Sequence, residues 1–360
     1  MDIRLIDAGK VSHLRSQTIY HALAYAKKAG SPDTIVLDVP AGPYVCIGFH
    51  RDLEQEVDIE FCAANKLPII RRETGGGTVY IDDGQLFVQW IFGPDNLPKK
   101  IDARFGLFVR PLIETYKSFG INAYFHAPTD VHVGGKKIVG TGAAAIGNAE
   151  VVTGNFLFDF DCGAMAKILK VPDESFREDI LNSLNKYMTS IKRELKDPPN
   201  MEEIKAAYII KCAETLGRKI VPGDFTDGEY KWMEELDKKF TTKEWLYQDS
   251  SNKRRNRVVK IHADIWMYEL HKKTEGGNIE MTLRTKGKRI DHVSIKGDFE
   301  IRPGHKLKGL ENVLRNVEIN EESLTEILEA FYILHRVETP GINIKDWVEA
   351  IMQIENYVKH

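Results

Sequence analysis

Apolar residues in the first two thirds of the chain recur at two spacings, one typical of strands and one typical of helices. Residues 85–92 (QLFVQWIF) form a bulky apolar run that suits a buried strand. Residues 15–30 carry apolar side chains at helical spacing and end at Gly30, which suits a helix C-cap. The expected helices are 15–30, 54–66, 101–119, 175–190 and 200–217. The expected strands are 34–39, 44–48, 85–92, 122–126, 130–134, 137–141 and 151–160.

These strands and helices follow one another irregularly, without a strict strand–helix–strand repeat. An irregular order favours a mixed-sheet α+β domain over a doubly wound parallel sheet. We expect this domain to span residues 1–250. The residues that follow are polar and basic and lack apolar periodicity, so residues 251–256 are predicted to form a linker.

The end of the chain has a pattern of its own. Residues 276–277 (GG) and 286–288 (KGK) are typical of turns, and they lie between segments that read as strands. The expected strands are 260–268, 278–284 and 289–296, and the expected helices are 322–335 and 344–357. The pattern predicts a small α/β domain over residues 257–360, with a sheet packed on helices.

Composition and charge exclude several classes of protein. The chain has 360 residues, of which 42% are hydrophobic and 29% charged, as in an ordinary soluble globular protein. A net charge of −3 creates no basic field that would recruit nucleic acid. The N-terminus lacks the apolar core of a signal peptide, and no run approaches the ~20 apolar residues of a membrane span. We therefore expect a cytoplasmic protein without a nucleic-acid or membrane partner.

The four cysteines agree with that compartment. They are scattered along the chain, without the paired spacing of a zinc site or of a disulfide framework. A reducing cytoplasm is the simplest interpretation. The cysteines are Cys46, Cys62, Cys162 and Cys212.

A glycine triplet at residues 75–77 lies between two expected strands, within the segment 71–80 (RRETGGGTVY). Three glycines permit positive φ and allow a ligand to approach the backbone, whose N–H groups can bind an anion. Arg71 and Arg72 add bidentate donors for a carboxylate or phosphate, and Thr74 adds a hydroxyl. The alternative is a glycine-rich surface hairpin, because the triplet matches neither a phosphate loop nor a dinucleotide fingerprint.

A second informative segment covers residues 130–145 (DVHVGGKKIVGTGAAA). Its small residues leave room beside the backbone, as at the wall of a pocket. A lysine at that edge could bridge a carboxylate and an α-phosphate and stabilise the transition state of acyl-adenylate formation. Neighbours on a strand face opposite ways, so we expect Lys137 to face the site and Lys136 the solvent. The alternative is that Lys137 is also a solvated lysine at the end of a hairpin.

Together the two segments resemble the lipoate–protein ligase family, within the biotin/lipoate ligase superfamily. The family signature RRxSGGGAVYHDxGN is similar to RRETGGGTVYIDDGQ at residues 71–85. The family's Asn-Asp pair and its K-I/V-x-G-S/T element correspond to Thr129-Asp130 and to residues 137–141 (KIVGT). Further elements agree in order, namely residues 45–50 (VCIGFH), residues 153–157 (TGNFL), and an S-x-x-W-like element at Thr242 and Trp245.

The resemblance implies a mixed-sheet catalytic domain of the class II synthetase-like type, followed by a fused accessory domain that activation of free lipoate requires. It also implies a reaction in which lipoate and ATP give lipoyl-AMP and pyrophosphate, with Mg²⁺ accompanying ATP. The lipoyl group then passes to a lysine of a lipoyl carrier. The implied carriers are lipoyl domains of 2-oxoacid dehydrogenase E2 subunits, the glycine cleavage H protein or a similar protein.

By position, the resemblance also implies functional residues, with Lys137 as the catalytic residue that contacts the lipoate carbonyl and the α-phosphate. Residues implied at the ATP or lipoyl-AMP site are Arg71, Arg72, Thr74, Gly75, Gly76, Gly77, Thr78, Val79, Asp82, Asp130, Lys137, Gly140 and Thr141. Residues implied at the lipoate site are Gly76, Lys137, Gly140, Ala143, Thr153 and Gly154.

Three departures from the family pattern concern side chains around the acyl group. The family His after the Val-Tyr pair is Ile81, the Asn after the turn glycine is Gln85, and a His-Gly pair is Thr153-Gly154. These changes affect the expected substrate preference between lipoate and octanoate more than family membership, because the turn and the lysine element are retained.

Three rival functions remain open. An octanoyltransferase would need an activated thiol, and Cys162 is the cysteine nearest to the expected pocket, although the adjacent aspartates would raise its pKa. A biotin–protein ligase would run the same adenylation chemistry, but we expect arginines inside its turn. A non-catalytic carrier of lipoate or lipoyl-AMP would keep the turn without productive ATP chemistry.

Overall fold

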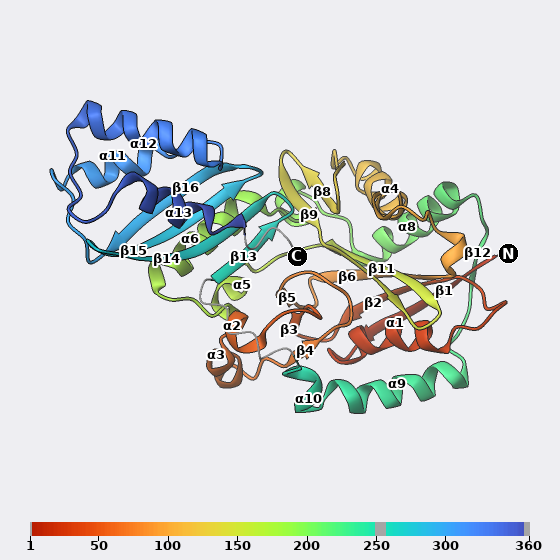
Figure 1. The fold of residues 1–360 in the computed structure, drawn as a ribbon. Coiled ribbons are helices and arrows are strands. Elements are labelled where there is room, and N and C mark those ends of the chain that lie inside the picture. Colours follow the sequence, from red (N-terminus) through yellow and green to blue (C-terminus); the bar gives the residue numbers. More distant parts are fainter. Residues whose placement is uncertain (1, 249–256, 356–360) are drawn as a thin grey trace. The chain divides into compact units, whose positions relative to one another are not determined.

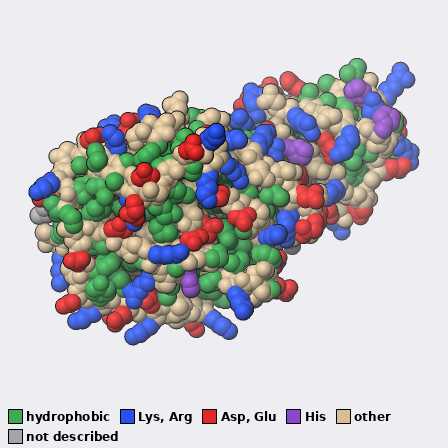
Figure 2. Space-filling model, turned by 180° about the vertical axis from the view of Figure 1, so that it is seen from behind, with side chains coloured by type: hydrophobic (Ala, Val, Ile, Leu, Met, Phe, Trp, Pro, Cys, Tyr) green, Lys and Arg blue, Asp and Glu red, His purple; other side chains and the backbone are tan. Residues whose placement is uncertain are grey.

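The computed structural model describes residues 2–248 and 257–355. The chain divides into two compact units, Met1–Asn252 and Lys253–His360. The predicted linker, residues 251–256, lies outside the described residues. On the face drawn in Figure 2, basic and acidic side chains are interspersed, which fits the small net charge.

A mixed six-stranded sheet forms the centre of the first unit (Figure 1). Its order is β10-β11-β6-β2-β1-β12, with parallel pairing of β1 to β2 and β12 and antiparallel pairing from β2 onward to β10. The strands are β1 (Ile3–Val11), β2 (Thr34–Pro40), β6 (Gln85–Phe92), β10 (Thr141–Ile146), β11 (Ala149–Leu157) and β12 (Ile220–Pro222). This mixture confirms the predicted α+β class.

Two three-stranded sheets accompany it. One has the order β4-β3-β5 and the other β7-β8-β9. Their strands are β3 (Tyr44–Ile47), β4 (Ile69–Arg71), β5 (Val79–Ile81), β7 (Tyr124–His126), β8 (Asp130–Val133) and β9 (Lys136–Val139). These two small sheets carry the two segments that the sequence singles out.

Helices cover both faces of the six-stranded sheet. One face packs on α4 and α8 through Trp90 and Phe156. The other packs on α1 through Val36 and Ile91, and α9 packs on α1. Figure 1 shows these helix pairs on opposite sides of the sheet. The helices of the first unit are α1 (Arg15–Ala26), α2 (Leu53–Glu56), α3 (Ile59–Ala64), the 3-10 turn η1 (Pro94–Asn96), α4 (Ile101–Ser118), α5 (Cys162–Ile168), α6 (Glu174–Tyr187), α7 (Ile191–Glu194), α8 (Met201–Leu216), α9 (Asp227–Phe240) and α10 (Lys243–Leu246).

The second unit has an antiparallel sheet of order β13-β14-β15-β16 and three helices. Alternate residues of its strands, such as Leu270, Leu283 and Val293, pack with Leu328 and Trp347 in a core separate from that of the first unit. The elements are β13 (Arg257–His262), β14 (Ile265–Thr274), β15 (Gly277–Lys286), β16 (Arg289–Gly297), α11 (Lys306–Val313), α12 (Glu321–His335) and α13 (Ile344–Met352).

Three predicted elements take another form in the structure, and β1, α5 and α9 are among the elements that were not predicted. The helix expected at residues 54–66 is two helices, because the Asp58 carboxylate caps a new helix at Ile59. The strand expected at residues 260–268 is the end of β13 and the start of β14. The small residues expected to form only a pocket wall also form a strand, β10. Among the described residues, no helix combines the length and apolar character that crossing a membrane requires.

Candidate functional site

The glycine triplet does not form a hairpin. The strands on either side of it, β4 and β5, are not paired with each other, and each pairs with a different edge of β3. The segment between them therefore crosses the end of β3. This arrangement rules out the glycine-rich hairpin that was the alternative interpretation of the sequence.

The crossing brings two backbone segments into direct contact. A Cβ on Gly48, just after β3, would lie 2.3 Å from the carbonyl oxygen of Gly76. Gly76 itself has φ +104°, a conformation that favours glycine. By contrast, a Cβ on Gly75 or Gly77 would meet no atom within 4 Å. Gly48 and Gly76 thus allow the crossing, while Gly75 and Gly77 border open space.

In the backbone of the turn, the carbonyl groups accept hydrogen bonds from the protein, while the N–H groups donate to none of its described residues. The carbonyl of Thr74 accepts a hydrogen bond from the Phe49 N–H, and that of Gly76 accepts one from Arg51 Nε. Arg72 Nη2 donates to the carbonyls of Gly75 and Gly77, both at 2.9 Å. Among the described residues, nothing accepts a hydrogen bond from the N–H groups of residues 75–77. The N–H and C=O of one trans peptide point in opposite directions. Because the carbonyls point toward the protein, the N–H groups point away from it and can donate to a ligand.

The two arginines before the triplet act differently. Arg71 is fully buried, and its guanidinium donates to the carbonyls of Gly48, Phe49, Arg51 and Leu246 at 2.7–3.1 Å. Arg72 is half-buried and also donates to the Cys46 carbonyl at 3.2 Å. Arg71 therefore supports the loops around the turn, and Arg72 supports the turn itself. Direct contact of either side chain with a nucleotide remains a prediction.

Helices α1 and α9 hold the turn from the other side, through Glu73. The Glu73 N–H donates to His21 Nε2 at 3.1 Å. Its carboxylate accepts hydrogen bonds from the Tyr25 hydroxyl at 2.9 Å and from Lys239 Nζ at 3.4 Å. Burial and Glu73 raise the pKa of Tyr25 to about 12, so this phenol stays protonated as a donor.

The Thr242 and Trp245 element belongs to the same support. The Thr242 hydroxyl accepts from the Trp245 N–H at the start of α10. The indole N–H of Trp245 donates to the Arg71 carbonyl at 2.9 Å, and its ring lies under Lys239 Nζ at 4.1 Å from the centroid. The sequence element therefore stabilises the turn from α10.

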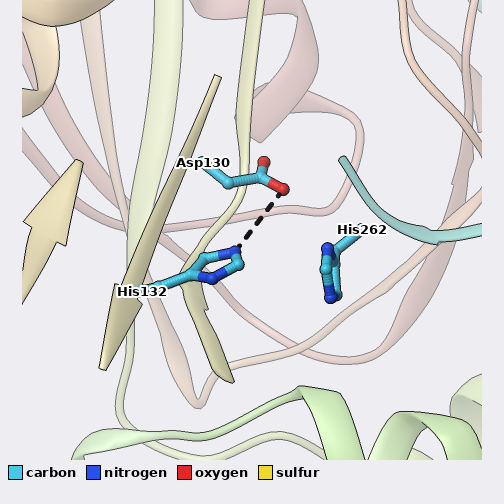
Figure 3. A group of neighbouring side chains, drawn as sticks. All are labelled: Asp130, His132 and His262. Carbon is cyan, nitrogen blue, oxygen red and sulfur yellow. Dashed lines mark ion pairs between the residues drawn. The ribbon is translucent and has the colours of Figure 1, made fainter. Parts of the chain in front are cut away.

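Lys137 is placed as strand alternation predicts. Lys136 is exposed, whereas the Lys137 side chain is 16% exposed and its Nζ lies 3.0 Å from Asp130 Oδ1. Asp130 and His132 both come from β8, with His132 Nε2 4.0 Å from Asp130 Oδ2 (Figure 3). The His126 ring stacks on that of His132 at 4.2 Å. The solvated alternative for Lys137 does not fit its ion pair.

Strand β10 lies next to both the residue that precedes this hairpin and the glycine turn. Thr141 Oγ1 donates to the Thr129 carbonyl at 2.6 Å, next to Asp130. A Cβ on Gly142 would lie 3.2 Å from Thr153 Oγ1 and 3.6 Å from Thr74 Oγ1. Thr74 and Thr153 therefore both lie next to Gly142 of β10, and their contact with a ligand stays a prediction.

Most of the remaining residues predicted at the ATP and lipoate sites contact other groups of the protein. Thr78 Oγ1 donates to Glu56 Oε2 at 2.7 Å, and Asp82 Oδ1 accepts from the Gly84 N–H at 3.0 Å. A Cβ on Gly154 would lie 2.8 Å from the Phe108 ring, so this glycine allows close packing of β11 on α4. Gly140 donates its N–H to Asn155 at 3.0 Å, Ala143 is half-buried, and Val79 is 37% exposed.

All four cysteines are free and buried. Cys162 begins α5 and accepts a hydrogen bond from Arg193 at 3.6 Å. Burial raises the pKa of its thiol, and Asp161 adds to the rise despite the opposing effect of Arg193. A buried thiol with a raised pKa is a poor nucleophile.

Sequence reasoning missed the side chains that support the turn. His21 and Tyr25 lie about fifty positions before Glu73, and no local pattern connects them to it. Arg51 could have been found, because it follows the Gly48-Phe49-His50 element directly and its carbonyl and Nε both contact the turn region.

Comparison with known families gives two matches. The family described as the lipoyl protein ligase A/B catalytic domain matches residues 14–213, and that described as the bacterial lipoate protein ligase C-terminus matches residues 266–351. Both lie where the sequence resemblance was found.

Individual relatives carry two different activities in their names. Lipoate–protein ligase 1 of Staphylococcus aureus is 27% identical over 296 residues, covering 81% of this chain and 84% of that protein. Octanoyltransferase LipM of Kyrpidia tusciae is 24% identical over 270 residues, covering 68% and 98%.

A solved structure supports the fold. The bipartite lipoate protein ligase of Thermoplasma acidophilum, described together with its E2 lipoyl domain, aligns with a TM-score of 0.64 and 25% identity. The alignment covers 71% of this chain and 99% of that one. It confirms the predicted mixed-sheet ligase fold.

Proposed function

Because the chain belongs to the lipoyl protein ligase A/B catalytic domain family, we propose that it uses ATP to activate lipoate and transfers the lipoyl group to a lysine of a carrier domain. The first unit, Met1–Asn252, is the catalytic domain of this proposal, and the second, Lys253–His360, is the accessory domain. A ligase is supported because one chain matches both the catalytic-domain family and the family of the lipoate protein ligase C-terminus.

The observation that carries the proposal is the polarity of the glycine turn. Its carbonyls are occupied by Phe49, Arg51 and Arg72, so the N–H groups of residues 75–77 are left to bind an anion. Phosphate oxygens of ATP are anions of this kind. Such donors are fixed before the substrate binds and therefore cost little reorganisation during the reaction.

Activation joins the acid to the nucleotide. A carboxylate oxygen of lipoate attacks the α-phosphorus of ATP, the bond from that phosphorus to the β-bridging oxygen breaks, and pyrophosphate leaves. Negative charge grows on the α-phosphate oxygens, where the Lys137 ammonium stabilises it. In the structure Lys137 pairs with Asp130, which holds the ammonium at the hairpin until the substrates bind. Mg²⁺ would accompany ATP and neutralise part of its charge.

Transfer then releases the nucleotide. The amine of a carrier lysine attacks the acyl carbonyl of lipoyl-AMP, an amide forms, and AMP leaves. The carriers we propose are E2 lipoyl domains or the H protein. Lys137 stays close to the acyl carbonyl and to the departing phosphate in this step as well.

The experiment separates the two half-reactions. The protein is incubated with ATP, Mg²⁺ and lipoate, and pyrophosphate release is measured before a lipoyl domain is added. We expect lipoate-dependent pyrophosphate release and then a lipoyl mass increase on the carrier. Pyrophosphate release without any transfer to the tested carriers would limit the function to activation, and no release would contradict the proposal.

The octanoyltransferase relative makes a second candidate necessary, in which an acyl group moves from acyl carrier protein through a cysteine. The burial of all four cysteines speaks against it. Octanoyl–acyl carrier protein supplied without ATP tests this candidate directly. Acylation of the lipoyl domain under those conditions would favour the transferase.

A further inference from the structure

One contact behind the glycine turn depends on a single histidine in α1. The Glu73 N–H donates to His21 Nε2 at 3.1 Å, while His21 Nδ1 lies 2.6 Å from the Gln17 carbonyl. Both hydrogen bonds form together only when the ring is neutral and carries its proton on Nδ1. The structure therefore requires one of the two neutral tautomers.

The surroundings of His21 maintain that state. The ring is fully buried, the Tyr20 ring lies 4.1 Å from it, and the Phe240 ring meets it edge-on at 5.0 Å. Burial above all, helped by the positive charges of Lys239 and Arg72, lowers the pKa of His21 to about 3, against the raising effect of the Gln17 hydrogen bond. The imidazole is thus neutral and has little room to turn.

Glu73 connects His21 to the glycine turn. Its N–H is held by His21, and its carboxylate by Tyr25 and Lys239. The next peptides carry the Thr74 hydroxyl and the N–H groups of residues 75–77. A change in the direction of the Glu73 peptide would therefore be passed to the donors that face the ligand.

We propose that His21 is a positioning residue for the adenylation site, which acts by fixing the Glu73 peptide and through it the N–H groups of the glycine turn. This inference rests on the proposed function, since it assigns His21 to the same site. His21 touches no substrate and transfers no proton. Its role is to keep the donors in place before ATP binds, and misplacement by about 1 Å can cost roughly a hundredfold in rate.

Two amide variants separate the two hydrogen bonds. In His21→Gln, the longer side chain can present an acceptor near the position of Nε2. In His21→Asn, the amide can still donate to Gln17 but is too short to reach Glu73. The matched control is Thr18→Val, which removes the 2.8 Å hydrogen bond from α1 to Asp237 of α9 without touching the turn.

Activity and amide exchange are measured on the full-length protein. We expect His21→Asn to lower kcat/KM for pyrophosphate release by about tenfold or more. Hydrogen exchange of the peptide covering residues 72–78 should be faster in this variant. His21→Gln and Thr18→Val should retain most activity and exchange protection at the turn. Equal behaviour of His21→Asn and Thr18→Val would overturn the proposal.

Two further readouts do not depend on activity. If the wild-type protein releases no pyrophosphate, the proposed function fails, but exchange at residues 72–78 still tests the positioning role. On the wild-type protein, ¹⁵N NMR of the His21 ring should show a protonated Nδ1 and a bare Nε2 that accepts from Glu73. A proton on Nε2 would overturn the proposal even if the variants do not fold.

Discussion

The glycine turn and the β8–β9 hairpin contribute different kinds of groups to the candidate site, and the structure holds them in different ways. The turn offers backbone N–H groups. It is supported by hydrogen bonds that Arg71, Arg72 and Trp245 donate and by one that His21 accepts from Glu73. The hairpin offers the ammonium of Lys137, at the end of a flexible side chain and paired with Asp130.

The difference follows from what each group must do. Backbone donors cannot move independently, so their position depends on the packing around them. A lysine ammonium can follow a charge from one oxygen to another. Variants of the turn should therefore change mainly stability and geometry, whereas a variant of Lys137 should change the chemistry more than the fold.

Replacing Lys137 should have the largest effect. In Lys137→Ala the charge that stabilises the α-phosphate is lost, so lipoyl-AMP formation should fall at least about a hundredfold. The variant should still fold, but its thermal unfolding midpoint should fall, because Asp130 is 2% exposed and loses its ion-pair partner while keeping its contacts with Thr129 and His132. Pyrophosphate release and a thermal melt measure the two effects.

Lys136→Ala is the matched control, since Lys136 is the neighbouring exposed lysine on the same strand. It should retain full activity. Near-normal adenylation by Lys137→Ala, or equal losses in the two variants, would contradict the assignment of Lys137.

The turn should respond in the opposite way. Arg71→Met removes the donor to the carbonyls of Phe49, Arg51 and Leu246, and a buried acceptor left unpaired costs ~1–3 kcal/mol. We expect the free energy of unfolding to fall by about 3 kcal/mol, as measured in urea. If Arg71→Met were as stable as the wild type but unable to bind ATP, Arg71 would be a ligand contact and not a support.

The roles of Lys137 and Arg71 also show which parts of the site can be predicted from the sequence alone. Strand alternation was enough to choose Lys137 over Lys136, because the period of two acts locally. Strand alternation could not predict that Arg71 and Arg72 have different roles, because the Arg71 guanidinium donates to the carbonyl of Leu246, 175 positions away in the sequence. His21 was missed for the same reason. Contacts between distant segments decide which polar side chains support the turn.

Lowering the pH should reveal the neutral histidine behind the turn. The pKa of His21 is about 3 in the fold, below its ordinary value of 6.5. Between these values the unfolded chain binds a proton that the folded chain does not, so stability falls as the pH drops from 6.5 toward 3. His21→Gln removes this titration. The difference in unfolding free energy, wild type minus variant, should fall by about 2 kcal/mol from pH 6.5 to 4.5.

The measurement is a urea titration of both proteins at each pH. Other groups whose pKa changes on folding, such as the buried Asp38 with its raised pKa, contribute equally to both proteins and cancel in the difference. A difference that stays constant with pH would mean that His21 is charged in the fold, and the hydrogen bond from Glu73 to Nε2 would then be absent.

The smallest effect is expected at Cys162, which belongs to neither the turn nor the hairpin. If the reaction needs only backbone donors and Lys137, Cys162→Ser should keep ATP-dependent lipoylation within about twofold of the wild type, a change of less than ~0.5 kcal/mol. Cys212→Ser, a second buried thiol on α8, is the control. Loss of acyl transfer in Cys162→Ser alone would add a thiol nucleophile to the site. The chemistry would then follow the octanoyltransferase relatives, and the turn would orient an acyl group instead of a nucleotide.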